Sequence, residues 1–260
     1  MNVLNTLADW RTRRASLKGR TIGFVPTMGA LHRGHGSLVE RCRAENEIVV
    51  VSIFLNPSQF NDATDLDRYP RTLDRDLAML DSLRTDEVIV PGAREMYPHG
   101  YGYRMEPPTA DLVLEGAHRP GFLQGVLTVV LKLLNLVRAD RAYFGEKDFQ
   151  QLKVVTAMTE EFFLPTQIVP CPTVREESGL AMSSRNALLS PEGRNKAAHL
   201  FRALTTAATC REARAALEAQ GFGVEYVEEC WGRRLAAAHL EGVRLIDNVL
   251  VDNAPAEGPR

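Results

Sequence analysis

Residues 21–35 read TIGFVPTMGALHRGH, a short apolar run that leads into a glycine-containing bend carrying two histidines. The run predicts a strand and the pattern after it predicts a helix, so His32 and His35 should lie where the strand gives way to the helix. Glycine lets the backbone approach a ligand closely, and N–H groups at a helix start attract phosphate. Imidazoles can donate hydrogen bonds to the same oxygens. The stretch predicts that histidines, rather than a P-loop lysine, handle nucleotide phosphates.

Further apolar runs alternate with helical patterns over the first two thirds of the chain. Helices are expected over His35–Glu47, around Leu73–Leu80 and over Leu123–Val137, the last apolar around most of its circumference. Repeated β-α-β order predicts an α/β fold, a Rossmann-like doubly wound parallel sheet with its ligand crevice at the carboxyl ends of the strands. The nearly continuous apolar character of residues 48–55 is typical of a parallel strand buried on both faces. The expected strands are Thr21–Val25, Ile48–Leu55, Glu87–Val90, Arg141–Phe144 and Gln167–Val169.

The pattern changes near residue 173, which divides the chain into an expected ligand-binding domain, 1–173, and a smaller α+β domain, 174–260. Ser190-Pro191-Glu192 is a good helix start, with serine as the cap and proline at the first position. The helical pattern then continues to about Leu217. Two short strands are expected at Val224–Val227 and Val243–Ile246, and the polar tail Asp252–Arg260 is expected to fray.

Composition excludes several classes of protein. The 260 residues carry a formal net charge of −2, which argues against a nucleic-acid-binding surface. No apolar stretch reaches the ~18–20 residues of a membrane span, and the N-terminus lacks the basic-then-apolar order of a signal peptide. The four cysteines are widely spaced, which predicts reduced thiols in a cytoplasmic protein.

Other polar clusters follow predicted strands. Residues 56–60, NPSQF, follow the second predicted strand, where an Asn-Pro turn and a ligand-positioning amide cluster fit the pattern equally well. In residues 145–151, GEKDFQQ, Lys147 can reach phosphate, Asp148 is expected to cap the next helix, and Gln151 should face the crevice. Residues 182–186, MSSRN, offer two hydroxyls and a guanidinium for polyphosphate oxygens. Each of these segments, taken alone, also fits an ordinary structural loop.

Some residues keep two interpretations. A zinc site at the histidine pair is disfavoured, because zinc needs about four ligands and no third histidine or Cys-x-x-Cys lies nearby. Thr72 is expected to cap a helix, and Asp74 and Asp76 in its first turn either match the helix dipole or act as outer-shell magnesium partners. Arg119 offers a further cation near the crevice, or lies in a surface loop.

Taken in order, these segments resemble the pantoate–β-alanine ligases of the nucleotidylyltransferase superfamily, which carry a His-x-Gly-His bend. The resemblance covers nearly the whole chain, and the GEKDFQQ stretch is far more specific to the family than the histidine pair. Its segments are 26–35, 56–60, 69–72, 119–135, 144–151, 182–186 and, more weakly, 244–248.

The resemblance implies a two-step reaction. ATP and (R)-pantoate form pantoyl adenylate and pyrophosphate, and β-alanine then displaces AMP to give pantothenate. ATP is the nucleotide substrate, and Mg²⁺ would be bound mainly through its oxygens. The family is typically dimeric, so the implied partners are small molecules and a second copy of the chain.

The resemblance also implies roles for individual residues. His35, His32 and Lys147 would be catalytic, with His35 matching the residue usually assigned as proton donor. Gln59 and Gln151 match the pantoate-holding glutamines, and Asn56 and Arg119 would assist in binding pantoate or β-alanine. The resemblance gives Asp74 and Asp76 no role, so both of their interpretations stay open. The implied ATP-binding residues are Met28, Gly29, Ala30, Leu31, His32, Arg33, Gly34, His35, Gly145, Glu146, Lys147, Asp148, Val174, Met182, Ser183, Ser184 and Arg185.

Two positions depart from the family pattern. Family members commonly carry His-Phe where this chain has Phe122-Leu123, so we expect the histidine's contact to be lost and either activity or β-alanine handling to be reduced. Gly36 replaces a bulkier apolar residue in the first helical turn. The alternatives to an active ligase are another nucleotidyltransferase of the superfamily and a non-catalytic ATP-binding relative. An aminoacyl-tRNA synthetase, which shares the bend, is disfavoured by the chain's length and charge.

Overall fold

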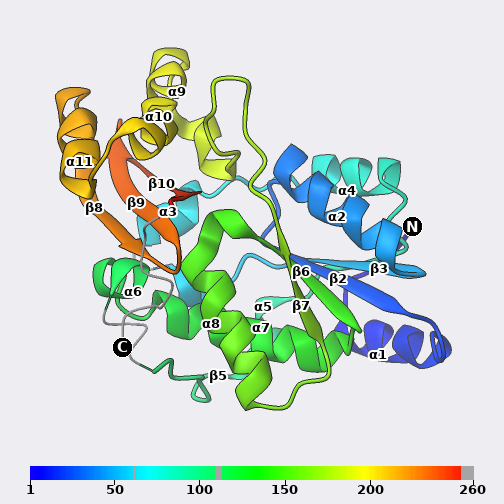
Figure 1. Ribbon diagram of the computed structural model, residues 1–260. Helices are drawn as coiled ribbons and strands as arrows, with labels where there is room; N and C mark the ends of the chain where they lie inside the picture. The colour runs from blue at the N-terminus through cyan, green and yellow to red at the C-terminus, as the bar shows by residue number, and fades with distance from the viewer. Residues whose placement is uncertain (61–62, 109–112, 253–260) are drawn as a thin grey trace.

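The computed structural model describes residues 1–60, 63–108 and 113–252. It contains a six-stranded parallel sheet and a separate three-stranded antiparallel sheet (Figure 1). The strands of the large sheet follow the order β1-β4-β3-β2-β6-β7. They are β1 (Asn2–Leu4), β2 (Ile22–Thr27), β3 (Ile48–Ile53), β4 (Glu87–Ile89), β6 (Arg141–Gly145) and β7 (Gln167–Cys171).

The large sheet is buried on both faces, as its apolar runs predict. Alternate β3 residues point to opposite sides, so Val49 and Val51 join one core and Val50 joins the other. Helices α2 and α4 cover the first side, and α1, α7 and α8 pack on the second (Figure 1). The helices of this part are α1 (Leu7–Ser16), α2 (Arg33–Glu45), α3 (Ala63–Arg68), α4 (Leu73–Ser82), α5 (Ala93–Met96), α6 (Leu114–His118), α7 (Phe122–Val137) and α8 (Phe149–Glu161), with 3-10 turns η1 (Pro57–Gln59) and η3 (Glu146–Asp148) and the short strand β5 (Pro98–Tyr101).

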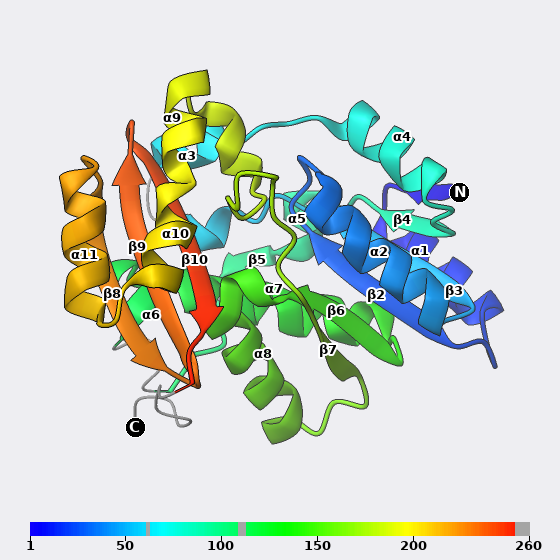
Figure 2. The ribbon, with the colours of Figure 1, turned by 45° about the horizontal axis from the view of Figure 1, so that its top comes forward.

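The C-terminal part builds its own core between the small sheet and its helices. Figure 1 shows α10 and α11 on the outer side of this sheet, where buried residues such as Leu204 and Leu217 pack on it. Its elements are the 3-10 helix η4 (Ser184–Leu188), α9 (Pro191–Ala197), α10 (His199–Thr206), α11 (Cys210–Ala219), β8 (Gly223–Cys230), β9 (Arg233–Leu240) and β10 (Val243–Leu250). In Figure 2, the segment after β7 runs between α2 on one side and α9 and α10 on the other.

Most predicted elements are confirmed, with corrections in the C-terminal part. Ser190 caps α9 as expected, its Oγ accepting from the Gly193 N–H at 2.9 Å. The single helix expected as far as Leu217 is wrong: three helices occupy this stretch, because Thr209 caps a new helix by accepting from Glu212 N–H at 3.2 Å. The central strand β9 is missing from the sequence-based prediction. Apart from Asp252, the predicted tail lies outside the described residues.

Gly36 is explained by the packing of α2 against α4. A Cβ at this position would lie 2.9 Å from the Met79 methyl carbon, so a bulkier residue here would need the Met79 side chain to move. The small residue allows the two helices to approach.

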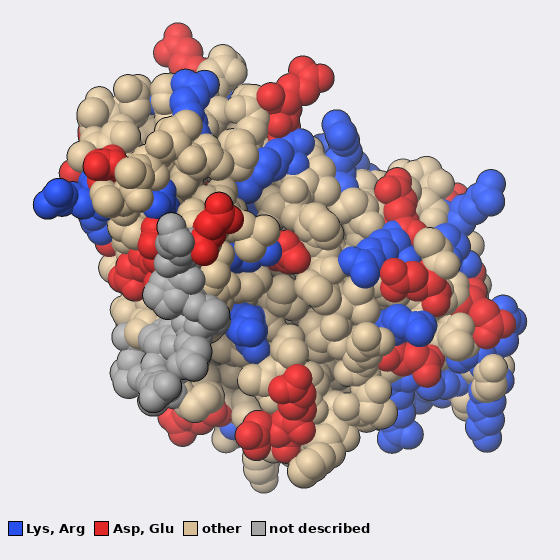
Figure 3. Space-filling model, viewed as in Figure 1, with Lys and Arg blue, Asp and Glu red and all other residues tan. Residues whose placement is uncertain are grey.

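The surface mixes charges of both signs. On the face drawn in Figure 3, Lys and Arg are interspersed with Asp and Glu. In the described part of the chain, no helix is long and apolar enough to cross a membrane.

Candidate active site

Two adjoining cavities open at the carboxyl edge of the large sheet, with volumes of about 230 and 560 Å³. The smaller one lies between the turns that follow β2, β3 and β6 and the apolar face of α7. Strand β2 lies between β3 and β6, so the sheet order alone brings these turns together. The larger cavity extends toward β10 of the C-terminal sheet. Residues lining both are Met28, Gln59, Lys147, Asp148, Gln151, Ser183 and Arg185.

The two histidines cap α2 reciprocally. His32 is the residue before the first turn, and its Nδ1 accepts from the Gly34 N–H at 3.1 Å. The His35 Nδ1 accepts in turn from the His32 N–H at 3.3 Å. Because both Nδ1 atoms accept, both rings must carry their proton on Nε2. Each ring therefore has an Nε2–H that is not used by the cap, and both rings line the smaller cavity.

Both imidazoles are held in the neutral form. Burial, and then the charge of Lys147, lowers the pKa of His32 to about 4. Burial, followed by His32 and Lys147, lowers the pKa of His35 to about 3. The pair therefore offers hydrogen-bond donors at neutral pH, while positive charge comes from Lys147 and Arg185.

We expect two of the six histidines to stay neutral in the Nε2–H tautomer down to about pH 5.5. Nitrogen-15 NMR of histidine-labelled protein measures this directly, and spectra of the His32→Ala and His35→Ala variants assign the two signals. Titration of either ring above pH 6 would contradict the burial argument.

The bend before these histidines depends on Asp76. Gly29 and Ala30 both have positive φ, +83° and +51°, a left-handed conformation that costs energy at alanine. The buried Asp76 carboxylate stabilises it by accepting from the Ala30 and Leu31 N–H groups, both at 2.8 Å. Thr72 Oγ1 also donates to Asp76, at 3.1 Å.

These contacts revise three sequence interpretations. The Asp76 carboxylate holds the bend, so its oxygens are already engaged and an outer-shell magnesium role is not supported. Asp74 is exposed on α4 and lines neither cavity. Thr72 precedes α4 as predicted, but its side chain makes no capping hydrogen bond.

The turn after β6 presents Lys147 and Gln151 to both cavities. Asp148 occupies the position before α8, but the expected side-chain cap is absent, and its carboxylate lies 3.9 Å from Lys147 Nζ. Glu146 pairs with Arg233 at 2.8 Å and lines neither cavity. Asn248 of β10 donates to the carbonyls of Glu146 and Lys147, at 2.9 and 3.0 Å, so the C-terminal sheet supports this turn.

The turn after β3 carries Gln59, which lines both cavities and is held in place by Asn56. Asn56 is almost fully buried, and its amide donates to Gln59 Oε1 at 3.0 Å and to the Gly125 carbonyl at 3.2 Å. Its Oδ1 accepts from the Tyr97 hydroxyl at 2.8 Å. Gln59 is thereby fixed with Nε2 toward Met28 Sδ, 2.9 Å away. Asn56 lines the smaller cavity and also orients Gln59.

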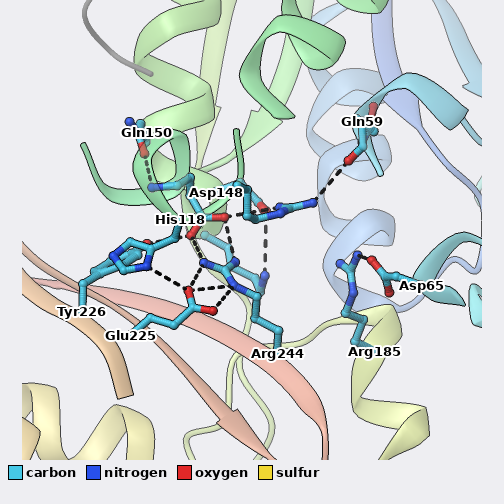
Figure 4. Close-up of polar contacts among 12 residues, drawn as sticks. Gln59, Asp65, His118, Asp148, Gln150, Arg185, Glu225, Tyr226 and Arg244 are labelled. Atoms are coloured by element: carbon cyan, nitrogen blue, oxygen red, sulfur yellow. Dashed lines mark hydrogen bonds and ion pairs between the residues drawn. The ribbon is translucent and has the colours of Figure 1, made fainter. Parts of the chain in front are cut away.

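The C-terminal loop closes the site from the opposite side. Ser184 Oγ donates to the Ala30 carbonyl at 3.0 Å, which ties this loop to the histidine bend. Arg185 pairs with Asp65 at 2.8 Å, as Figure 4 shows, so an incoming anion would compete with that carboxylate. Val174 accepts from the Met182 N–H at 3.0 Å. The residues of this segment that line the smaller cavity are Val174, Met182, Ser183, Ser184 and Arg185.

The structure thus gathers most of the residues that the sequence singles out. His32, His35, Lys147, Gln59 and Gln151 meet at the smaller cavity. Arg119 lines only the larger one. The predicted ATP-binding residues that line neither are Gly29, Ala30, Leu31, Arg33 and Glu146.

An ion cluster that the sequence analysis missed joins the two parts of the molecule. Glu115 of α6 is buried. Its carboxylate accepts hydrogen bonds from both terminal nitrogens of Arg244, at 2.7 and 2.8 Å, and from the Tyr226 hydroxyl, at 2.8 Å. Figure 4 shows Arg244 also contacting Glu225, at 2.7 Å. Nothing local marks these residues, because the partners lie on β8 and β10, more than a hundred positions away.

The described residues contain no group of three or more His, Cys, Asp or Glu side chains placed to hold a metal ion. Among the described residues that line the smaller cavity, Asp148 alone carries a carboxylate, and the other polar groups are mainly amides, imidazoles, hydroxyls and cations, which suit phosphate oxygens. A magnesium ion would therefore be held mainly by the oxygens of a bound triphosphate.

Comparison with known proteins gives a consistent result. The family model described as Pantoate-beta-alanine ligase matches residues 2–250. A pantothenate synthetase from Bdellovibrio bacteriovorus is 52% identical over 249 residues, covering 96% of this chain and 99% of the relative. The crystal structure of pantothenate synthetase from Thermus thermophilus aligns with a TM-score of 0.90 at 44% identity, covering 96% of this chain and 99% of that one. A Francisella tularensis pantoate-beta-alanine ligase, crystallised with a β-γ ATP and β-alanine, aligns with a TM-score of 0.93 at 39% identity, covering 96% and 97%.

Proposed function

The chain belongs to the pantoate–β-alanine ligase family, and on that premise we propose how its residues carry out the reaction. The protein is an ATP-dependent ligase that joins (R)-pantoate to β-alanine. A carboxylate oxygen of pantoate attacks the α-phosphorus of ATP, and the bond to the β-phosphate breaks to release pyrophosphate. The β-alanine amine then attacks the acyl carbon of pantoyl adenylate. The bond to AMP breaks, and the amine loses a proton.

The observation that carries this proposal is the meeting of His32, His35 and Lys147 with Gln59 and Gln151 around one cavity. The first three contact phosphate, and the two amides bind the carboxylate and hydroxyl of pantoate without adding charge. On the opposite wall, α7 presents Val126, Val129 and Val130, which suit the two methyl groups of pantoate.

Charge neutralisation accounts for the first step. A carboxylate must approach a polyphosphate, so both negative groups need positioning and compensation. The His35 Nε2–H donates to the phosphate oxygens, where charge develops as pyrophosphate leaves, and Lys147 and Arg185 supply the positive charge. Mg²⁺, held mainly by ATP oxygens, would supply further compensation.

The second step uses the larger cavity, which adjoins Gln59 and Gln151. Arg119 lies there at the boundary with the C-terminal sheet and binds the carboxylate of β-alanine. This places the amine at the other end of the molecule, toward the acyl carbon of pantoyl adenylate.

Incubation of the purified protein with ATP, Mg²⁺, pantoate and β-alanine tests the function. The ligase reaction gives AMP, pyrophosphate and pantothenate in equal amounts, and AMP formation requires pantoate. A protein that bound ATP without turnover would instead be a non-catalytic relative. One that left the nucleotide on its product would be a nucleotidyltransferase.

Replacement of Gln151 by Ala should raise the KM for pantoate by about 10-fold or more, the scale of one lost hydrogen bond to a charged group. The KM for ATP should change much less, because the phosphate ligands remain. Initial rates with each substrate varied measure both constants, and Gln167→Ala, an exposed glutamine on β7, is the matched control. An unchanged pantoate KM would remove Gln151 from the pantoate site.

The remaining proposals concern the whole molecule. We take residues 1–173 as the ATP- and pantoate-binding domain and 174–260 as a lid, supported by the two separate sheets and the loop contacts at Ser184. A cytoplasmic homodimer is proposed on family membership, and the unpaired state of the four cysteines fits a reducing compartment. Sedimentation equilibrium tests the dimer, and fractionation of cells tests the location.

A further inference from the structure

Phe122 and Arg119 form a stacked pair at the mouth of α7. The Arg119 guanidinium carbon lies 3.6 Å from the centre of the Phe122 ring. The ring is 7% exposed, so the pair is shielded from water on one side, where a cation–π contact is strongest. The family resemblance predicts a lost contact at this position. In the structure, the phenylalanine makes a contact of its own.

The stacking leaves the guanidinium plane with polar partners along its edge. Arg119 donates to Glu115 Oε2 at 3.3 Å and to the Gln59 backbone carbonyl at 3.3 Å. Figure 4 shows the second contact as the dashed line that ends at Gln59. These partners hold the edge of the guanidinium, and the Phe122 ring covers its face. The ring therefore contributes to the direction in which Arg119 points.

The ring itself is fixed by the packing of α7. Gly121, with φ of +80°, turns the chain into the helix immediately before Phe122. Three residues further on, a Cβ on Gly125 would lie 2.3 Å from the Ser58 carbonyl oxygen, so α7 lies directly against the turn that carries Gln59. Phe122, Arg119 and Gln59 consequently keep one arrangement along the larger cavity, which all three line.

We propose that Phe122 is a positioning residue for the second step: its ring holds the Arg119 guanidinium flat at the larger cavity, ready to bind the carboxylate of β-alanine. The inference rests on the proposed function of the site. A guanidinium fixed in one orientation loses less rotational freedom on binding a carboxylate, so affinity for the amine substrate depends on the ring. Phe122 lines the larger cavity and not the smaller one, where His32 and His35 lie, so we expect adenylate formation to depend little on the ring.

Phe122→Leu and Phe122→Tyr test the proposal, with Phe163→Leu, at a 92% exposed ring, as the matched control. Leucine removes the π-face but keeps an apolar side chain, whereas tyrosine keeps the face. We expect Phe122→Leu to raise the KM for β-alanine about 5- to 30-fold. In this variant, the rate of pantoate-dependent ATP–pyrophosphate exchange and the kcat at saturating β-alanine should both stay within about twofold of the wild-type values. Phe122→Tyr should keep the KM for β-alanine close to the wild-type value.

A double-variant comparison isolates the link through Arg119. In an Arg119→Met background, Phe122→Leu should cause no further rise in the β-alanine KM. The proposal is overturned if Phe122→Leu leaves the β-alanine KM unchanged, if it slows exchange equally, or if its effect persists without Arg119. Failure of the proposed function gives a different result, since the wild-type protein would then form no pantothenate at all.

Discussion

The His35→Ala variant should form pantoyl adenylate about 10²–10³-fold more slowly than the wild-type protein, the scale of losing one donor to a transition-state charge. His35 is held by the His32 backbone and keeps its Nε2–H for the cavity, so alanine removes the donor. Because burial keeps the pKa of this ring near 3, the wild-type reaction uses a neutral imidazole. The rate loss should therefore be similar at pH 6 and pH 8.

Pantoate-dependent ATP–pyrophosphate exchange measures this step without β-alanine. His99→Ala is the matched control, because His99 is exposed on β5 and lines neither cavity. Substituting His35 also removes a hydrogen bond of the cap, so circular dichroism must show an intact fold. Exchange within a factor of three of wild type in a folded variant would exclude His35 from catalysis.

Replacement of Glu115 by Ala should destabilise the protein by about 3–5 kcal/mol, the cost of removing one partner from a buried ion pair. Glu115 is 6% exposed and bonded to both terminal nitrogens of Arg244. Its loss would leave Arg244 with Glu225 alone and Arg119 without a carboxylate. The contact between α6 and the C-terminal sheet should weaken most, because the carboxylate joins the two.

Thermal unfolding should show a Tm lower by roughly 10 °C or more, and Glu40→Ala, at an exposed position on α2, should show almost no change.

Burial raises the pKa of Glu115, but Arg244 and Arg119 outweigh it and hold that pKa below its usual range. A lowered carboxyl pKa stabilises the fold above the unfolded value of about 4.3, and that stability is lost as pH falls through the folded pKa. The difference in Tm between the Glu115→Ala variant and the wild-type protein should therefore be largest near pH 7 and should become smaller below about pH 4. Equal Tm values for the Glu115 and Glu40 variants at pH 7 would contradict the cluster's role.

Local sequence predicts the strands of the large sheet well where burial leaves a strong signal. Residues 48–53 are apolar almost throughout because both faces of β3 are covered. β1 has only three residues and depends on pairing with β4. β9 reads RRLAAAHL, and alanine favours strands poorly, yet Ala236, Ala237 and Ala238 are fully buried in it. Pairing with β8 and β10, which no local pattern encodes, makes this stretch a strand.

Local sequence was enough to select candidate groups at the strand ends: the histidines of residues 32–35, Lys147 and the glutamines 59 and 151. Each of these groups follows a recognisable strand or opens a helix, but the local patterns also fit ordinary loops, and the roles of the glutamines came from the family resemblance. That these turns meet is a result of the folded sheet, since the order β3-β2-β6 is a property of its strand pairing. The fold also gives Asp76 its place at the histidine bend and lets Glu115 join the two parts. Those roles depend on partners 45 to 129 positions away, and contacts over such distances leave no periodic signal in the chain.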